Sequence, residues 1–371
     1  MSPADRIPFN DLSRMEPAVK REIGTAIQRV VDSGWYVLGP EHDAFEAELG
    51  AYLGASEVVL LGNGTDALEI ALAAVGVGTG DTVVTVANAG AYATIAIRQM
   101  DATPLYCDVS PETLLMTPEL FTTVLDAAQV VPKAVVVTHL YGGMARVDEI
   151  VAIAHARGIA VVEDCAQSLG AQVDGRQAGT FGDIATTSFY PTKNLGALGD
   201  GGAIFTNNAE LGTLARRMRQ YGWASKYSIE FDHGRNSRLD EMQAAVLRVK
   251  LPHLDRWNAR RRDIHAQYRA ASSAAARVVG APDASFIAHL AVAVVADRPA
   301  AKAALAELGI STDVHYPIPD HQQRFPTRRP APVSLPVTER AATEVLSVPM
   351  FPELSDAEVE RVSAALASLG A

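Results

Sequence analysis

Short apolar runs alternate with longer amphipathic stretches through the first part of the chain. The apolar runs predict β-strands at 57–61, 82–87, 104–107, 134–140, 159–163, 184–189 and 203–206. The amphipathic stretches predict helices at 42–53, 67–75, 92–100, 117–128 and 147–157. Strands that alternate with helices in this way predict an α/β fold, with a mostly parallel sheet that the helices cover on both faces.

The pattern changes after residue 207, where longer helical stretches dominate. A predicted helix at 239–251 is interrupted by Pro252, and the remaining predicted elements are helices at 253–272, 300–308 and 355–369 and a strand at 290–295. We therefore expect a large domain, 1–250, and a smaller C-terminal domain, 251–371. Residues 317–336 contain six prolines and are expected to form a loop, and whether this loop is an ordered lid over a substrate stays open.

Composition narrows the class of protein. The chain has 371 residues, of which 48% are hydrophobic, and a net charge of −11. This balance argues against a nucleic-acid surface and favours a soluble exterior whose net charge repels other copies. The two cysteines, Cys107 and Cys165, give no disulfide framework, and no metal site is predicted. No secretion signal or membrane span is visible, so we expect a cytoplasmic protein.

A glycine-rich turn follows the first predicted strand and precedes a helix. Residues 62–66 read Gly-Asn-Gly-Thr-Asp. Backbone N–H groups at such a turn, together with the helix dipole, can bind a phosphate group. The alternative is an ordinary turn in which Thr65 or Asp66 caps the helix. The turn does not have the GxGxxG pattern of an NAD-binding protein.

An acid and a lysine follow two later strands. Asp164 comes directly after the predicted strand at 159–163, and Lys193 comes soon after the strand at 184–189. Residues at the carboxyl ends of parallel strands face one crevice. Pyridoxal phosphate chemistry needs this pair, because the lysine amine carries the cofactor as a Schiff base while the acid partners the pyridine nitrogen. Ser188 could donate to the cofactor phosphate. Each residue alone also has an ordinary structural explanation.

Four segments resemble motifs of the DegT/DnrJ/EryC1/StrS family of pyridoxal-phosphate sugar aminotransferases. They are residues 63–68, 163–171, 188–202 and 234–245, and the resemblance runs from about residue 7 to the C-terminus. It implies fold type I of the pyridoxal enzymes, with a mixed seven-stranded sheet in the large domain, a smaller C-terminal domain, and a homodimer whose active sites lie at the subunit interface.

The resemblance also implies roles for individual residues. Lys193 would carry pyridoxal 5′-phosphate, which becomes pyridoxamine 5′-phosphate after the first half-reaction, and Asp164 would bind the ring nitrogen. The other implied cofactor contacts are Gln167 near the ring hydroxyl; Gly64, Thr65, Asp66 and Ser188 at the phosphate; and Asn236 at the phosphate of the neighbouring subunit. The family's usual aromatic after the Ala-Asn motif is missing, because Ala89 and Gly90 follow Asn88. We expect Tyr92 to stack on the cofactor instead, although a core or surface tyrosine is a rival interpretation.

Substrates follow from the same resemblance. They are L-glutamate and a nucleoside-diphosphate-linked keto-deoxysugar, and the sequence around Arg248 favours members that act at C-3 of a 3-keto-6-deoxyhexose. His315 and Tyr316 are expected to touch the sugar, with a strand end and proline turn as the alternative. Arg216, Arg217 and Arg219 could meet the diphosphate, but a solvated helix face is the preferred interpretation.

Several rival functions stay open at this point. Some family members act at C-4 or on cyclitol ketones, and others dehydrate sugars. Lys193 disfavours those dehydrating members that are known for loss of the lysine. A non-catalytic regulatory relative is also disfavoured, because both Lys193 and Asp164 are present.

Overall fold

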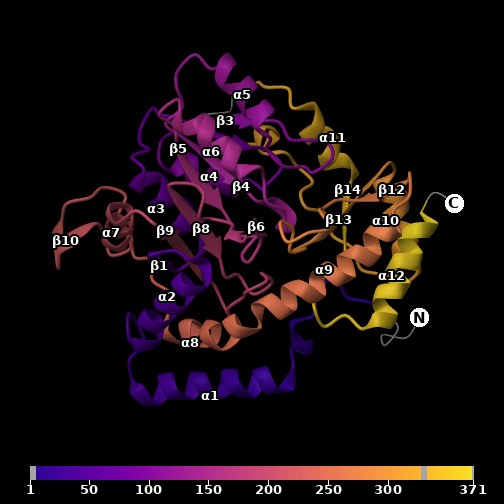
Figure 1. Ribbon diagram of the computed structural model, residues 1–371, viewed down its shortest axis with the longest axis horizontal. Coiled ribbons are helices and arrows are strands. Elements are labelled where there is room, and N and C mark those ends of the chain that lie inside the picture. Colours follow the sequence, from indigo (N-terminus) through magenta and orange to yellow (C-terminus); the bar gives the residue numbers. More distant parts are fainter. Residues whose placement is uncertain (1–5, 327–331, 370–371) are drawn as a thin grey trace.

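The large domain is built on one seven-stranded sheet. The structure, a computed structural model, describes residues 6–326 and 332–369 (Figure 1). The strand order is β1-β9-β8-β5-β4-β2-β3, and only β9 runs antiparallel to the others. The strands are β1 (Glu57–Leu61), β2 (Thr82–Val86), β3 (Thr103–Cys107), β4 (Ala134–Thr138), β5 (Ala160–Asp164), β8 (Ile184–Ser188) and β9 (Gly202–Thr206). The predicted mixed, mostly parallel sheet is confirmed.

Helices lie on both faces of this sheet, as the alternating pattern predicts. They are α2 (Pro40–Leu53), α3 (Gly64–Ala74), α4 (Tyr92–Gln99), α5 (Pro118–Ala127), α6 (Val147–His155) and α7 (Ala209–Met218). The strands are almost wholly buried; every residue of β4, for example, is shielded from solvent. A strand buried on both faces has a continuous apolar sequence, which is why these strands were recognisable.

The smaller domain has an antiparallel sheet of three strands in the order β12-β13-β14. These are β12 (Ala276–Val278), β13 (Ala291–Val295) and β14 (Val345–Val348). Its helices are α9 (Leu254–Ala270), α10 (Arg298–Glu307), α11 (Pro336–Glu344) and α12 (Asp356–Ser368). The long helix α9 follows α8 (Glu241–Lys250), and the two run one after the other above α1 in the lower part of Figure 1.

Pro252 does not stop the helical path between α8 and α9. It lies at the start of a single 3₁₀ turn, Leu251–His253, where the missing N–H of proline costs little. The chain therefore passes from one predicted domain to the other without a loop. The boundary at 250/251 stays a prediction.

The first long helix, α1 (Pro17–Ser33), lies across the outside of α8 and was not predicted. Its buried residues are Val19, Ile23, Ala26 and Val30, which recur every three or four positions. Short β-hairpins were also missed, including β6–β7 (Gln172–Val173, Arg176–Gln177) and β10–β11 (Trp223–Ser225, Ser228–Ile229). The second hairpin stands away from the body of the molecule in Figure 1.

The proline-rich segment 317–336 is anchored at both ends. Near its start, the buried Asp320 carboxylate accepts hydrogen bonds from Ala91 N at 2.9 Å and Thr94 Oγ1 at 2.7 Å. Just past its end, Asp108 accepts from Val337 N and Thr338 N at the start of α11. The segment includes a 3₁₀ turn at Asp320–Gln322, and residues 327–331 lie outside the described part of the chain.

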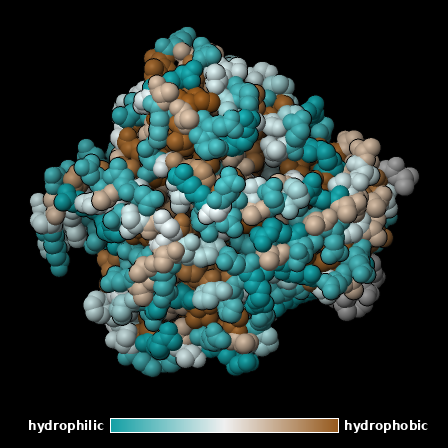
Figure 2. All heavy atoms as spheres, in the orientation of Figure 1, coloured by the Kyte–Doolittle hydropathy of each residue, from teal (hydrophilic) through white to brown (hydrophobic). Residues whose placement is uncertain are grey.

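The face of the molecule in Figure 2 is mostly hydrophilic, and hydrophobic residues show in separate patches. Within the described residues, no helix is long and apolar enough to cross a membrane.

Candidate active site

A cavity of about 620 Å³ opens at the carboxyl edge of the large sheet. The ends of β4, β5 and β8 and the first turn of α3 border it, and so do segments of the small domain. Nine of the predicted site residues line it together: Gly64, Thr65, Tyr92, Asp164, Gln167, Ser188, Lys193, His315 and Tyr316. These residues therefore lie together at the edge of the sheet that the strand-end argument from the sequence predicts.

Asp164 is the last residue of β5 and is 6% exposed. Its parallel partner is Thr186 on β8, so both strands deliver their ends to the same place. The carboxylate accepts a hydrogen bond from Ala166 N at 3.1 Å. Burial raises the pKa of Asp164 above its ordinary value, while the hydrogen bond and the positive charge of Lys193 act in the opposite direction. A cation placed against this carboxylate would keep it ionised.

The neighbouring acid, Glu163, does not line the cavity, and its carboxylate is hydrogen-bonded within the core. It accepts from Gly179 N, Phe181 N and Gly182 N at 2.6–2.8 Å. The His139 Nδ1 atom accepts from a backbone N–H, so the Nε2 atom donates to Glu163 at 3.0 Å. Glu163 is thus a satisfied core carboxylate, and Asp164 is the acid that faces the cavity.

Lys193 is held on a tight turn that follows β8. Its N–H donates to Tyr190 O at 2.8 Å. The turn needs Gly196, because a Cβ there would lie 2.3 Å from Pro191 O. The buried Lys250 ammonium donates to Gly196 O and so ties the turn to α8. Burial lowers the pKa of Lys193 to about 8, against the opposing effect of Asp164. The amine is therefore available as a nucleophile near neutral pH.

The glycine turn between β1 and α3 forms a cradle against Ser188. Asn63 is the helix cap, since its side-chain oxygen accepts from Asp66 N at 2.8 Å. Gly64 has no room for a side chain, because a Cβ would lie 2.8 Å from Ser188 Cβ. The close approach brings Ser188 and Thr65 to one side of the cavity at a helix N-terminus, where backbone N–H groups attract an anion.

Asp66 is not among the residues that line the cavity. Its backbone N–H is used by Asn63, and its carboxylate contacts Asn63 Nδ2 at 3.0 Å and Arg235 Nη1 at 3.3 Å. Of the three predicted turn residues, the described structure therefore brings Gly64 and Thr65 to the cavity and leaves Asp66 beside it.

Gln167 joins the two domains at the cavity wall. Its Oε1 accepts from Tyr141 N at 2.6 Å, and its Nε2 donates to Tyr316 Oη at 3.2 Å. Tyr141 Oη in turn donates to His315 O at 2.5 Å. His315 is further fixed by Ser347 at 2.8 Å and by stacking on Phe9. The predicted pair His315 and Tyr316 is thus part of an ordered wall rather than a simple strand end.

Tyr92 lies at the mouth of the cavity, at the start of α4, and the residue is 51% exposed. It meets Tyr316 edge to face, with ring centroids 6.2 Å apart. Gly90 makes room for this pair, because a Cβ there would lie 2.8 Å from the Tyr316 ring and 3.0 Å from the Tyr92 ring. The exposed face leaves Tyr92 free to cover a planar ligand.

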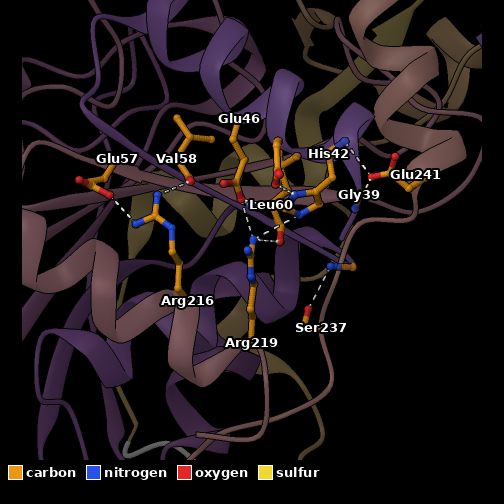
Figure 3. Close-up of polar contacts among 12 residues, drawn as sticks. Gly39, His42, Glu46, Glu57, Val58, Leu60, Arg216, Arg219, Ser237 and Glu241 are labelled. Atoms are coloured by element: carbon orange, nitrogen blue, oxygen red, sulfur yellow. Dashed lines mark hydrogen bonds and ion pairs between the residues drawn. The ribbon is translucent and has the colours of Figure 1, made fainter. Parts of the chain in front are cut away.

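Asn236 is exposed and does not line the cavity of its own chain. It pairs with Gln220 as an isolated β-bridge. Beside it, Ser237 Oγ accepts from Gly62 N at 3.0 Å and so braces the base of the glycine turn (Figure 3).

The three arginines of the α7 region also lie outside the cavity. Arg219 is 6% exposed, so the expected solvated face is wrong for this residue. Its Nη1 donates to Glu46 at 2.6 Å and to Leu60 O at 3.1 Å, which ties α7 to α2 and β1 (Figure 3). Arg216 pairs with Glu57, and Arg217 lies 3.8 Å from Glu230.

Some cavity residues were not predicted. They are chiefly Phe9 and Asn10 near the N-terminus, Asp200, His289 and Asp313. Phe9 and Asn10 precede the first recognised element, so no pattern marked them. His289 offered a signal, as a polar residue just before the apolar strand β13.

The described residues fit pyridoxal 5′-phosphate. An amine with a lowered pKa, Lys193, faces the same cavity as a buried carboxylate, Asp164. The glycine turn and Ser188 provide a site for the phosphate at a helix N-terminus. Tyr92 provides an aromatic face.

Comparison with known proteins agrees with this chemistry. A pleiotropic regulatory protein of Geobacillus stearothermophilus is 41% identical, with 96% of each chain covered. A dTDP-3-amino-3,4,6-trideoxy-α-D-glucose transaminase of Streptomyces venezuelae is 39% identical, covering 96% of this chain and 94% of the relative. The crystal structure of NtdA from Bacillus subtilis with bound pyridoxamine phosphate matches with a TM-score of 0.90 and 29% identity, covering 98% of this chain and 84% of the other. The sequence profile of the DegT/DnrJ/EryC1/StrS aminotransferase family matches residues 17–367, and the chain belongs to this family, whose cofactor is pyridoxal phosphate.

Proposed function

We propose that this aminotransferase moves an amino group from L-glutamate to C-3 of a dTDP-linked 3-keto-6-deoxyhexose. The observation that carries the proposal is the placing of Lys193 and Asp164 on one cavity at the carboxyl edge of the sheet. The preference for C-3 is supported by the Streptomyces venezuelae relative, which is named for a 3-amino sugar product. The arrangement of His315 and Tyr316 on the cavity wall supports sugar recognition there.

When bound, pyridoxal phosphate supplies a carbon that joins the donor amine and a ring that takes up the electron pair left at Cα. Asp164 keeps the ring nitrogen protonated, because a buried carboxylate stabilises a neighbouring positive charge. Lys193 Nζ, once freed, takes the proton from Cα of glutamate and returns a proton to C-3 of the sugar in the second half-reaction. Gly64, Thr65 and Ser188 hold the phosphate. Gln167 would hold the ring hydroxyl, and Tyr92 would cover the ring.

We further propose that the enzyme works as a homodimer. Among the described residues that line the cavity, Lys193 is the only lysine or arginine, although both substrates are anions. Further cations and Asn236 would come from the neighbouring subunit. Exposed apolar side chains support a subunit contact: Trp35 near α2, and Tyr227 and Ile229 on the β10–β11 hairpin.

An absorbance spectrum of the cofactor-loaded enzyme tests the first half-reaction. We expect a visible band that L-glutamate bleaches. Lys193→Ala should lose this response, because no amine remains to move the proton. Asp164→Asn should keep the fold and slow the bleaching about 10²-fold or more, because the neutral amide no longer stabilises a protonated ring nitrogen.

The second half-reaction tests regiochemistry. The glutamate-treated enzyme is offered 3-keto and 4-keto dTDP-sugars and a cyclitol ketone, and products are identified by mass spectrometry and NMR. Amination of the 3-keto sugar alone supports the proposal. If the enzyme prefers another ketone, the proposed substrate is wrong and the proposed aminotransferase activity still holds. A wild-type protein that binds no pyridoxal phosphate, or whose band is untouched by amino donors, would contradict the transaminase activity.

A further inference from the structure

Two carboxylates lie directly behind the glycine turn that is proposed to hold the cofactor phosphate. Asp66 is the third residue of α3, and Glu69 follows it by three positions on the same helix. Thr65, the residue before Asp66, lines the cavity, whereas Glu69 is buried. Two negative charges therefore lie within the first two turns of the helix whose N-terminus faces the phosphate site.

These charges act against an anion at the glycine turn. A phosphate monoester is mostly a dianion at neutral pH. Among the described residues that line the cavity, Lys193 is the only lysine or arginine, and Lys193 is proposed to hold the cofactor by its aldehyde carbon. The attraction for the phosphate must come mainly from the backbone N–H groups and the dipole of α3. Carboxylates near the same helix end use this attraction themselves and repel a second anion.

Arg235 balances both carboxylates. Its Nη1 atom donates to Asp66 Oδ1 at 3.3 Å and also to Glu69 Oε2. The other oxygen of Asp66, Oδ2, accepts from Asn63 Nδ2 at 3.0 Å. Both oxygens of Asp66 are thus held by side chains, which keeps this carboxylate beside the cavity. The three charged side chains are between 8% and 26% exposed, so solvent screens them less than it screens charges on an open surface.

The backbone of Arg235 is fixed independently of α3. Arg235 N donates to Met218 O at 2.8 Å, and Arg235 O accepts from Tyr221 N at 3.0 Å. Two residues later, Ser237 Oγ accepts from Gly62 N at 3.0 Å, at the start of the glycine turn. The segment 235–237 therefore holds the turn by a hydrogen bond and holds the following helix by charge.

We propose that Arg235 is a positioning residue for the cofactor phosphate. By balancing Asp66 and Glu69 and holding the Asp66 carboxylate beside the cavity, Arg235 leaves the N-terminus of α3 to the phosphate group. Arg235 is not one of the described cavity-lining residues, so it acts through the two carboxylates. The inference deepens the proposed function, because it rests on the phosphate site proposed at the glycine turn. It is independent of the amino donor and of the sugar.

Cofactor affinity provides the test. Full-length protein freed of cofactor is titrated with pyridoxal phosphate, without donor or sugar, and the visible absorbance band gives the dissociation constant. Pyridoxal, which lacks the phosphate, is the control probe for the rest of the cavity. Arg235→Met removes the charge and keeps a long side chain. It should weaken binding of pyridoxal phosphate about tenfold and leave binding of pyridoxal unchanged.

Two further variants separate charge from shape. Arg235→Lys keeps the positive charge and should bind pyridoxal phosphate within about threefold of wild type. Arg235→Met combined with Glu69→Gln removes one charge of each sign, so the double variant should also return to within about threefold of wild type. Glu69→Gln alone removes only a negative charge and should bind at least as tightly as wild type.

The proposal is overturned if Arg235→Met binds pyridoxal phosphate as well as wild type does, or if it loses pyridoxal and pyridoxal phosphate equally. It is also overturned if neither Arg235→Lys nor the added Glu69→Gln recovers the affinity, because Arg235 would then serve only to shape the segment that carries Asn236. Weaker binding in Glu69→Gln, a test that does not need Arg235→Met to fold, would contradict it too. A wild-type protein that binds no pyridoxal phosphate would overturn the proposed function as well, whereas failure of the variants alone leaves that function standing.

Discussion

Asp320 shows how a single buried acid can link the cavity wall to pH. Asp320 is only 1% exposed. Burial raises the pKa of its carboxyl group to about 6, although two hydrogen bonds act to lower it. The residue lies four positions after Tyr316 and its carboxylate caps α4, the helix that begins at Tyr92. The position of both tyrosines at the cavity mouth therefore depends on this carboxylate.

The raised pKa makes a prediction about stability. Between about pH 4 and pH 6 the folded protein holds a proton on Asp320 that the unfolded chain has released. The stabilisation is therefore complete below the unfolded pKa and is lost as the pH rises through 6. Relative to wild type, Asp320→Asn should gain about 3 kcal/mol in the free energy of unfolding between pH 4 and pH 7. Urea unfolding at fixed protein concentration measures this, and parallel pH curves for the two proteins would contradict it.

Among the elements, α2 depends on an acid that is distant in the sequence. The Glu241 carboxylate, at the start of α8, accepts from Gly39 N, Glu41 N and His42 N at 2.8–2.9 Å (Figure 3). It occupies the N-terminus of α2, where the helix dipole favours a negative charge. This contact fixes α8 against α2, and α2 in turn holds Arg219 and β1.

Removing that cap should destabilise the protein strongly. Glu241→Ala leaves two buried N–H groups and one partly buried N–H group without an acceptor, so we expect the free energy of unfolding to fall by about 3 kcal/mol. A suitable control is Glu48→Ala, which removes a partly exposed ion pair with Arg248 and should cost less than about 1 kcal/mol. Equal losses in urea unfolding would mean that Glu241 acts as one more surface charge.

Elements that are buried on both faces were easier to predict from the sequence than elements that are partly exposed. Strands such as β4 and β5 are buried on both faces, so their sequences are continuous apolar runs. In α1 the buried positions are separated by charged residues, and the helix covers α8 rather than the sheet. The three-residue strand β12 includes an exposed Arg277 and gives too short a pattern to recognise. Its place is set by pairing with β13, which is a tertiary contact.

For the whole molecule, the proposed dimer can be tested by mixing two inactive or weakened variants. Lys193→Ala removes the amine of its own cavity, and Asn236→Ala removes the residue proposed to reach the neighbouring one. In a mixed dimer, one cavity then holds both defects and the other holds neither. Random exchange of equal amounts should restore about a quarter of wild-type activity.

The same experiment identifies which cavity Asn236 serves. If Asn236 acted within its own chain, the mixed dimer would have one cavity without Lys193 and one without Asn236. Activity would then stay at the average of the two parent variants. Size-exclusion chromatography and differently tagged subunits provide the control that exchange has occurred.

The site was predictable where it depended on strand ends, and not where it depended on distant partners. Asp164 and Lys193 each follow an apolar run, and parallel strands bring such ends together. The prediction for Arg219 was wrong because its ion-pair partner, Glu46, is 173 positions away in the sequence. The place of His289 on the cavity wall depends on Asn194, whose side chain contacts the imidazole ring and is held in turn by Asn258 of α9.

The antiparallel strand of the large sheet, β9, has a consequence for how the protein folds during synthesis on the ribosome. Strand β1 lies at the edge of the sheet, and β9 is its neighbour there, with Glu57 opposite Thr206. A nascent chain that has not yet emerged past residue 206 therefore cannot seat β1, and the glycine turn that follows β1 has no support against Ser188. Strand β9 also pairs with β8, the strand that precedes Lys193. Its insertion between β1 and β8 therefore assembles the glycine turn and the lysine turn in one late step.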